Sequence, residues 1–291
     1  MRAIAPGKLV LTGAYAVLDG APAIVAAVDR YAIADASHAG TDDERAPEAD
    51  VRALYDEAGR KLGLGSSAAA IVASLGACAL ARGEDLESPA VRSHLFRAAR
   101  AAHARAQGGG SGVDVAASVH GGVLCYAINP NGDAKVRSLE LPSRVQMTAY
   151  DSGTSARTSH LLARFDALRA SGGARRFLRA LGDLATRASA AVEAGDAPSF
   201  IGLACEFGRA LALLGEACDA PVVPPAFAEL GALAELESAA FLPSGAGGGD
   251  VAVWLGLAPP SAAFTSRAQA LAMRPLALRI DRRGLHAESP P

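Results

Sequence analysis

The feature that most constrains the fold is a run from Leu62 to Ala81 that contains no charged residue and begins with glycines and serines. Alanine dominates the run and is the strongest helix former, so we predict a central helix from Ser67 to Arg82. The run is long enough to cross a membrane, but alanine contributes little transfer free energy to a bilayer. A buried core helix preceded by a glycine-serine turn is therefore predicted.

The turn before this helix is a candidate phosphate-binding loop. Small residues let several backbone N–H groups converge at a helix N-terminus, where the helix dipole favours an anion. The GxxxxGK[ST] pattern of a Walker A loop is absent from the sequence. For this element alone, a serine N-cap on a buried helix is the alternative. The nucleotide-binding candidates are Lys61, Gly63, Leu64, Gly65, Ser66, Ser67 and Ala68, with the Ser67 hydroxyl also a candidate ligand for Mg²⁺.

Composition narrows the partners to small molecules. The 291 residues are 51% hydrophobic and 20% charged, with a formal net charge of -2, which is typical of a soluble globular protein. A nucleic-acid partner is not expected, because the arginines are scattered among acidic residues and form no basic stripe.

The N-terminus shows no secretory signal, so we expect a cytoplasmic protein without a membrane segment. The four cysteines show no CxxC spacing and are expected to be buried, reduced thiols.

The order of the predicted elements indicates an α+β protein with two lobes, residues 1–142 and 143–291. Short apolar runs separated by glycine and proline predict strands at Ala3–Ala5, Ala23–Ala27, Ala32–Ser37, Gly122–Tyr126, Val145–Tyr150, Val251–Leu255 and Ala277–Ile280. Further helices are predicted from Ser88 to Gln107 and at Thr158–Ala170, Arg175–Ala194, Pro198–Cys218 and Pro225–Ala239. The tail after Gly284 is expected to fray.

Three separated motifs together resemble the GHMP kinases, a family that includes galactokinase, homoserine kinase, mevalonate kinase and phosphomevalonate kinase. The motifs are Ala5-Pro6-Gly7-Lys8-Leu9-Val10-Leu11-Thr12-Gly13, the Gly63–Ala69 loop, and Pro243-Ser244-Gly245-Ala246-Gly247-Gly248-Gly249-Asp250. The resemblance spans nearly the whole chain. It implies a ribosomal-S5-like α/β N-terminal lobe, a ferredoxin-like α+β C-terminal lobe with extra helices, and the use of ATP and Mg²⁺.

Finer details resemble the branch of the family that phosphorylates 5-phosphomevalonate to 5-diphosphomevalonate. They are Ala26–Tyr31, Ala102–Gln107, Ser152–Ser159 and the glycines before Asp250. A phosphorylated, mevalonate-like acid is therefore the expected substrate, bound by a monomer or a homodimer. Mevalonate kinase or another GHMP small-molecule kinase is the alternative, and a catalytically silent ligand sensor with this fold is an alternative of another class.

By its match to the family motif, Lys8 is expected to neutralise charge on the transferred phosphate, and Asp114 to lie near the acceptor. A solvated lysine and a helix N-cap are the respective alternatives. Asp114 would act as a general base on a hydroxyl acceptor, but a phosphate acceptor is already largely dianionic near neutral pH and hardly needs one. The resemblance also implies substrate contacts at Lys8, Tyr15, His103, Ser111, Gly112, Ser155, Arg157 and Gly247.

The sequence departs from the family at three points. Ala14 stands where the family usually has glutamate, and the region between Ser37 and Lys61, which helps to hold adenine in relatives, is short. His103 lies eleven residues before Asp114, where mevalonate kinase-like members carry a magnesium-binding glutamate. An imidazole in place of that carboxylate favours binding of a more negative acceptor. The alternative is that His103 is only a packed side chain of its helix.

Overall fold

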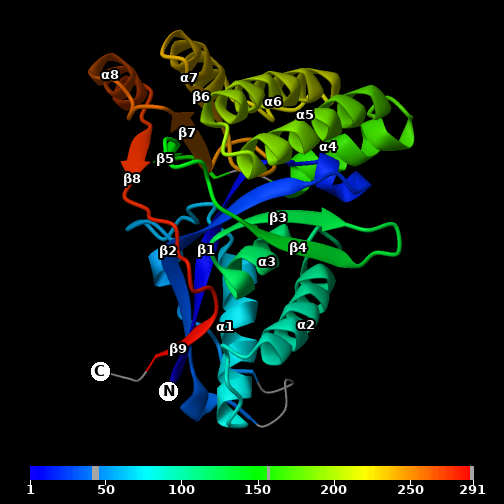
Figure 1. Ribbon diagram of the computed structural model, residues 1–291, viewed down its shortest axis with the longest axis vertical. Coiled ribbons are helices and arrows are strands. Elements are labelled where there is room, and N and C mark those ends of the chain that lie inside the picture. Colours follow the sequence, from blue (N-terminus) through cyan, green and yellow to red (C-terminus); the bar gives the residue numbers. More distant parts are fainter. Residues whose placement is uncertain (41–45, 156–157, 289–291) are drawn as a thin grey trace. The chain divides into compact units, whose positions relative to one another are not determined.

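A computed structural model describes residues 1–40, 46–155 and 158–288 (Figure 1). It contains two sheets and eight α-helices, which confirms the predicted α+β class. The chain divides into two compact units, each built from separate stretches of sequence. Unit 1 comprises Met1–Leu9, Val25–Leu124 and Arg279–Pro291, and unit 2 comprises Val10–Ile24 and Cys125–Leu278. The lobe boundary at residue 142 stays a prediction.

The first sheet has the strand order β4-β3-β2-β1-β9. Its strands are β1 (Arg2–Thr12), β2 (Ala23–Asp35), β3 (Val123–Ile128), β4 (Ala134–Leu139) and β9 (His286–Glu288). The expectation of a frayed tail after Gly284 is wrong for residues 286–288, because β9 pairs antiparallel with β1 and places Glu288 opposite Arg2. Only long-range backbone pairing reveals this strand, since its local sequence is short and polar.

Three helices of unit 1 pack on one another: α1 (Ser66–Ala81), α2 (Pro89–Gln107) and α3 (Val113–His120). Helix α1 is the predicted central helix, and most of its residues are buried. At Gly76 it approaches the sheet closely, because a Cβ there would lie 2.8 Å from Leu285 Cδ1 and 3.1 Å from the Ala3 Cβ. Small residues therefore let α1 lie directly against β1 and the C-terminal segment.

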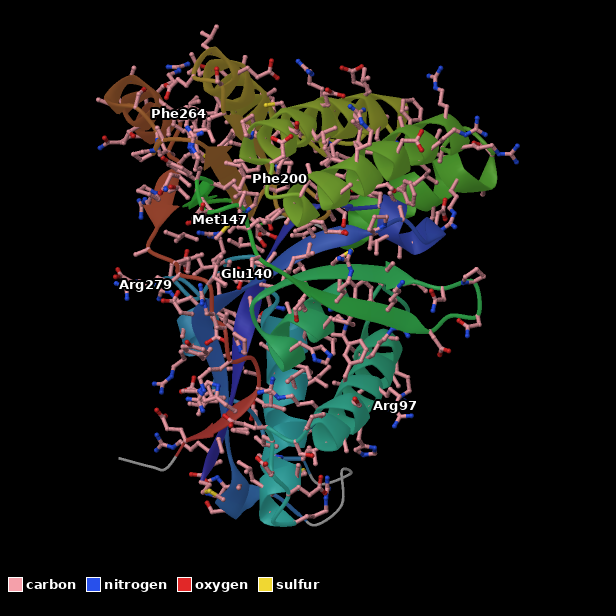
Figure 2. All side chains as sticks on the ribbon, in the orientation of Figure 1. Arg97, Glu140, Met147, Phe200, Phe264 and Arg279 are labelled. Carbon is pink, nitrogen blue, oxygen red and sulfur yellow. The ribbon has the colours of Figure 1, made fainter. Side chains whose placement is uncertain are left out.

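The second sheet is antiparallel, with the order β6-β7-β5-β8, and lies in unit 2. Its strands are β5 (Gln146–Asp151), β6 (Ala240–Pro243), β7 (Val251–Gly256) and β8 (Arg274–Leu276). The helices of this unit are α4 (Thr158–Ala170), α5 (Arg175–Glu193), α6 (Ala197–Ala217), α7 (Pro225–Leu236) and α8 (Ala262–Ala270). An aromatic cluster joins sheet and helices: the Trp254 and Phe264 ring centroids are 4.5 Å apart, and Phe264 in α8 is 1% exposed (Figure 2).

Besides β9, four elements differ from the sequence expectations. Strands β4 and β6 and helix α8 were not predicted, and the strand expected at Ala277–Ile280 lies earlier, at β8. Helix α8 is short, and its clearest signal is the cap residue Ser261, whose Oγ accepts a hydrogen bond from the Phe264 amide. Ile280 instead forms an isolated bridge with Val28. Such short elements depend on tertiary pairing more than on local pattern.

Helix α6 is long and apolar enough to cross a membrane by length and composition, and nearly half of its most apolar window is buried inside the fold. It contacts α5 and β6, as the core helix of a folded domain does.

All four cysteines are free thiols, and three of them are buried, as predicted. Cys205, the exception, is half-buried.

Candidate functional site

The glycine-serine loop forms the N-terminus of α1. Gly63 and Gly65 have left-handed φ angles of 73° and 79°, and Gly65 is the N-cap residue. No side chain of the cap residue bonds the first amides of the helix, and these amides lack intrahelical partners by geometry. A hydrogen bond of 2.8 Å from the Lys8 amide to the Leu64 carbonyl holds the loop against β1. The loop thus presents free backbone donors beside Lys8, as a phosphate cradle requires.

The side chain of Lys8, a residue of β1, extends to this loop. Its Nζ donates a hydrogen bond of 3.0 Å to the Gly63 carbonyl. A Cβ built at Gly65 would lie 3.0 Å from Lys8 Cγ and 3.7 Å from Asp114 Cβ. The structure therefore brings the loop, Lys8 and Asp114 together within unit 1, with Gly65 filling the narrow space between the two charged side chains.

Asp114 is in the first turn of α3, which follows the left-handed cap residue Gly112. Its Oδ1 accepts a hydrogen bond of 3.0 Å from the Val115 amide, and its side chain is 21% exposed. The buried Ser118, one turn later, donates a hydrogen bond of 2.7 Å to the Pro6 carbonyl. Pro6 is two residues before Lys8 in β1. This bond therefore joins β1, which contains Lys8, to α3, which contains Asp114.

His103 faces Asp114 from α2. Its side chain is 4% exposed, and its Nε2 lies 3.5 Å from Asp114 Oδ2. This separation is within ion-pair range, yet Nε2 has no hydrogen bond to any described residue. A buried polar nitrogen without a hydrogen bond is uncommon in folded proteins and is costly. His103 is therefore poised beside the Asp114 carboxylate, and its predicted contact with substrate stays a prediction.

The remaining predicted residues of unit 1 differ in exposure. Ser66 is 7% exposed and Leu64 and Ala68 are fully buried, so these three shape the loop from the inside. Ser67 is half-buried, whereas Lys61 is exposed and its backbone bridges to Tyr55. The Ser111 hydroxyl accepts a hydrogen bond of 3.3 Å from the Val113 amide. Of these side chains, the Ser67 hydroxyl has the position and exposure that suit a ligand contact.

The described residues contain no group of three His, Cys, Asp or Glu side chains that could hold a metal ion. Mg²⁺ usually keeps several waters and binds through few protein groups plus substrate phosphates. The residues around the α1 N-terminus fit that pattern, with Ser67 as the candidate hydroxyl ligand. They also fit a triphosphate, since the first amides of α1 lack intrahelical partners and Gly65 adds no side chain at the cap.

Three other predicted residues lie in unit 2. The Tyr15 hydroxyl donates a hydrogen bond of 2.6 Å to the Ala246 carbonyl, and burial raises the pKa of this phenol far above its ordinary value. Gly247 packs against the chain itself, because a Cβ there would lie 2.0 Å from the Val222 carbonyl oxygen. Ser155 is exposed. Arg157 lies outside the described residues.

Sequence reasoning missed residues that support the site. Ser118 is one, and its only signal is a hydroxyl in the otherwise apolar end of α3. Arg100 is another: its side chain covers Gly112, where a Cβ would lie 2.8 Å from Arg100 Cγ. Its spacing of three residues before His103 puts it on the same helix face.

Comparisons with known proteins agree with this geometry. Residues 30–122 match the family model for the GHMP kinases N terminal domain. The phosphomevalonate kinase of Streptomyces sp. (strain CL190) is 28% identical over 334 residues, covering 86% of this chain and 88% of the relative.

Solved structures have the same fold. The Lin0012 protein from Listeria innocua has a TM-score of 0.82 at 22% identity, covering 96% of this chain and 97% of that one. Streptococcus pneumoniae phosphomevalonate kinase, solved with phosphomevalonate and AMPPNP, has a TM-score of 0.77 at 18% identity, with 96% and 99% covered. Mevalonate kinase from L. major has a TM-score of 0.68 at 18% identity, with 99% and 97% covered. Residues 30–122 are thus similar to the N-terminal domain of the GHMP kinases, and the chain has the fold of these solved kinases.

Proposed function

We propose that this kinase transfers the γ-phosphoryl group of ATP to 5-phosphomevalonate, giving 5-diphosphomevalonate and ADP. The observation that carries the proposal is the arrangement at the start of α1, where Gly65 lies against both Lys8 and Asp114 and the His103 imidazole lies 3.5 Å from the Asp114 carboxylate. Two groups able to carry positive charge around one anion suit a site that must accept a second anion. The similarity to the Streptomyces enzyme supports the same acceptor.

The nucleotide phosphates would lie at the free amides of Gly65, Ser66 and Ser67, where the helix dipole favours negative charge. ATP supplies the phosphoryl group. In this proposal Lys8 moves its Nζ from the Gly63 carbonyl to the transferred phosphate, which is a small shift for a flexible side chain. Ser67 would give Mg²⁺ its side-chain ligand, and water and phosphate oxygens would complete the shell.

The acceptor is a phosphate monoester whose second pKa is about 6, so its oxygen is nucleophilic near neutral pH without a base. That oxygen forms the new bond to the γ-phosphorus, while the bond from the γ-phosphorus to the β,γ-bridging oxygen breaks and ADP leaves. No proton has to move from a dianionic acceptor. The site therefore has to bind two anions side by side and to stabilise the negative charge of the transition state.

Asp114 acts in this scheme as an orienting group. Its Oδ1 is already engaged by the Val115 amide, and its Oδ2 faces His103 at 3.5 Å. A bare carboxylate would repel an anionic acceptor. In this proposal the imidazole closes the 3.5 Å gap and donates from Nε2 to the carboxylate, which weakens that repulsion. A hydroxyl acceptor would instead need Asp114 as a general base.

The acceptor contacts proposed in unit 2 rest on the family resemblance: Tyr15, Ser155, Gly247 and Arg157. Ser111 and Gly112 are proposed on the same grounds at the start of α3. We also propose the lobe boundary at residue 142, a cytoplasmic location, and a monomer or homodimer.

Mevalonate kinase is the second candidate, since solved mevalonate kinases share the fold. The feature that opposes it is His103 next to the presumed base, in place of a magnesium-binding carboxylate. A silent ligand sensor is opposed by the joint retention of Lys8, Ser67 and Asp114 in one place.

The test is an ADP-release assay with mevalonate, 5-phosphomevalonate, 5-diphosphomevalonate, homoserine and sugars, followed by phosphorus NMR of the product. The expected result is turnover of 5-phosphomevalonate, with two coupled resonances that report a new P–O–P linkage. Turnover of mevalonate but not of its phosphate would assign the chain to mevalonate kinase. ATP binding without turnover of any acceptor would favour the sensor.

A further inference from the structure

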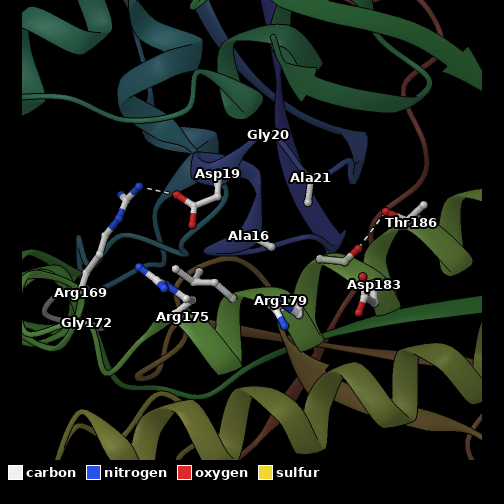
Figure 3. A pocket seen from close by; sticks show the side chains of 12 residues that line it. Ala16, Asp19, Gly20, Ala21, Arg169, Gly172, Arg175, Arg179, Asp183 and Thr186 are labelled. Atoms are coloured by element: carbon white, nitrogen blue, oxygen red, sulfur yellow. Dashed lines mark hydrogen bonds and ion pairs between the residues drawn. The ribbon is translucent and has the colours of Figure 1, made fainter. Parts of the chain in front are cut away.

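A second basic site lies wholly within unit 2, in a cavity of about 600 Å³ between α5, the end of α4 and the turn after a short 3₁₀ helix, η1 (Ala16–Asp19). Figure 3 shows Arg175 and Arg179 of α5 at this cavity below Gly20 and Ala21, with Arg169 joined to Asp19 at one end. The volume is in the range of small-molecule pockets. None of these residues was among the predicted site residues.

The start of α5 breaks a general electrostatic preference. Helix N-termini favour acidic residues because the helix dipole is positive there, and like charges one turn apart repel. The first turn of α5 has no acidic residue and no side-chain cap, yet Arg175 and Arg176 begin the helix and Arg179 follows one turn later. The sequence therefore concentrates positive charge where it costs stability.

Most arginines of unit 2 helices pair with an acidic or aromatic side chain, and the exceptions identify the cavity arginines. On helices α4 to α8, every arginine except Arg175 and Arg179 has an acidic or aromatic partner among the described residues. The pairs are Arg164–Asp219, Arg169–Asp19, Arg176–Phe177, Arg187–Glu206, Arg209–Glu235 and Arg267–Glu229. Within the part of the chain that the structure describes, no ion pair joins Arg175 or Arg179 to a carboxylate. The two uncompensated guanidinium groups are the two that line the cavity on α5.

The wall of the cavity formed by the turn after η1 consists of small residues. Gly20 has a left-handed φ of 86° and ends η1, so the chain turns there without a side chain. Gly182 of α5 lies against the turn, since a Cβ there would be 3.4 Å from the Ala21 Cβ. The cavity is thus bounded by a short turn and the α5 surface, with both free arginines at its edge.

From these features we infer that this cavity binds the phosphate or diphosphate group of a small ester that also carries hydroxyl groups. Guanidinium groups bind phosphate oxygens through paired hydrogen bonds. Asp183, one turn beyond Arg179, offers a carboxylate acceptor for a hydroxyl group at the far end of such a ligand. The inference does not depend on the identity of the proposed acceptor, because it uses no residue of the α1 loop.

The test is calorimetric titration with inorganic diphosphate, with the α1 site occupied by a non-hydrolysable ATP analogue. The variants are Arg175→Gln and Arg179→Gln, alone and together. The control Arg176→Gln removes one positive charge, as each single variant does, from the same helix turn outside this cavity. We expect the dissociation constant to rise about ten-fold or more in the double variant and to stay within about two-fold in the control. Equal affinity in wild type and double variant, or no binding to wild type, would overturn the inference.

Stability gives an independent readout, because removing like charges from a helix N-terminus relieves repulsion. The double variant should therefore keep or raise the thermal midpoint of the ligand-free protein, and diphosphate should raise the midpoint of wild type only. If the double variant fails to fold, the two single variants are tested in the same way. A ligand-dependent shift that survives in the folded variants would contradict the site.

Kinetics separates two sources of the ligand. If the site holds the acceptor of this kinase, KM for the acceptor rises in the double variant while kcat changes less. If it holds a separate effector, KM is unchanged and any effect of diphosphate on turnover disappears. Both outcomes require the two arginines. Failure to turn over 5-phosphomevalonate, with diphosphate binding intact, would reject the proposed acceptor and leave this site standing.

Discussion

Two glycine-rich loops illustrate why a motif alone does not make a site. The Gly63–Ser67 loop leads into a long helix and lies beside the charged side chains of Lys8 and Asp114. The 245–249 loop between β6 and β7 has left-handed glycines as well, but Gly247 packs on the Val222 carbonyl and Gly248 on the Leu161 side chain. In the first loop glycine leaves amides free for a ligand, and in the second it lets the chain pack on itself.

The largest effect that separates the loops is expected from Lys8→Met. Losing a cation beside the first loop should lower kcat by about 10²- to 10³-fold, since such groups act on charge that develops in the transition state. The dissociation constant for ATP should change little, because the backbone amides remain. Rapid-quench and nucleotide-binding measurements check this, and a near-normal kcat would remove Lys8 from the site.

The next effect concerns the second loop. Gly247→Ala places a Cβ within 2.0 Å of a backbone oxygen at a φ of 79°, so the loop has to move. We expect a loss of about 3 kcal/mol or more in the free energy of unfolding, as for other substitutions that overpack strained backbone. Denaturant unfolding measures the loss. A loss below that of Gly65→Ala would contradict the self-packed description of this loop.

Gly65→Ala has the same φ of 79°, but its closest contact is the flexible Lys8 side chain, with Cγ at 3.0 Å, and Asp114 Cβ lies at an ordinary contact distance of 3.7 Å. The left-handed conformation should cost about 1 to 2 kcal/mol of stability. Activity should fall further than stability explains, because the new methyl group pushes Lys8 aside. Comparing kcat at a temperature where the variant is fully folded tests this, and wild-type kcat there would argue against the close packing of Lys8 on the loop.

His103→Leu tests the environment of Asp114. Removing the buried imidazole leaves the carboxylate without its neighbour, which should lower kcat/KM for the phosphorylated acceptor by about ten-fold, as loss of a charge-assisted contact does. Gln, which keeps a donor, should recover part of the loss. A purely structural histidine would lower the thermal midpoint in both variants without this partial recovery.

The smallest effect is expected from Ser67→Ala. Water can replace one hydroxyl in the shell of Mg²⁺, so activity at saturating magnesium should fall only a few-fold, in line with one hydrogen bond. The magnesium concentration for half-maximal rate should rise. Ser66→Ala is the matched neighbour, and an equal rise there would mean that Ser67 has no special place at the ion.

The sequence predicted the first loop better than the second because its signal is local. The glycines, the serines and the apolar helix that follows are adjacent, so α1 and its cap could be inferred from one segment. The neighbours Lys8 and Asp114 came from family motifs, and the structure brings both to Gly65. The assignment of their roles remains a prediction.

What the sequence could not reveal depends on distant partners. Strand β9 exists because it pairs with β1, and the Ser118 bond to Pro6 crosses more than a hundred residues. The packing of Gly247 on Val222 is equally non-local. The basic cavity at α5 was also not predicted. Arg175 and Arg179 differ from the other arginines of these helices only in lacking an ion-pair or aromatic partner, which the sequence does not show.

The most direct test of the central proposal is the ratio of kcat/KM for 5-phosphomevalonate to that for mevalonate, measured with one enzyme preparation by ADP release. The proposed site, with Lys8 and His103 near Asp114, predicts a ratio of about 10² or more, since a site whose polar groups are built to bind a phosphate rejects an acceptor that lacks it. A ratio below one would contradict the proposal and make Asp114 a general base for a hydroxyl acceptor.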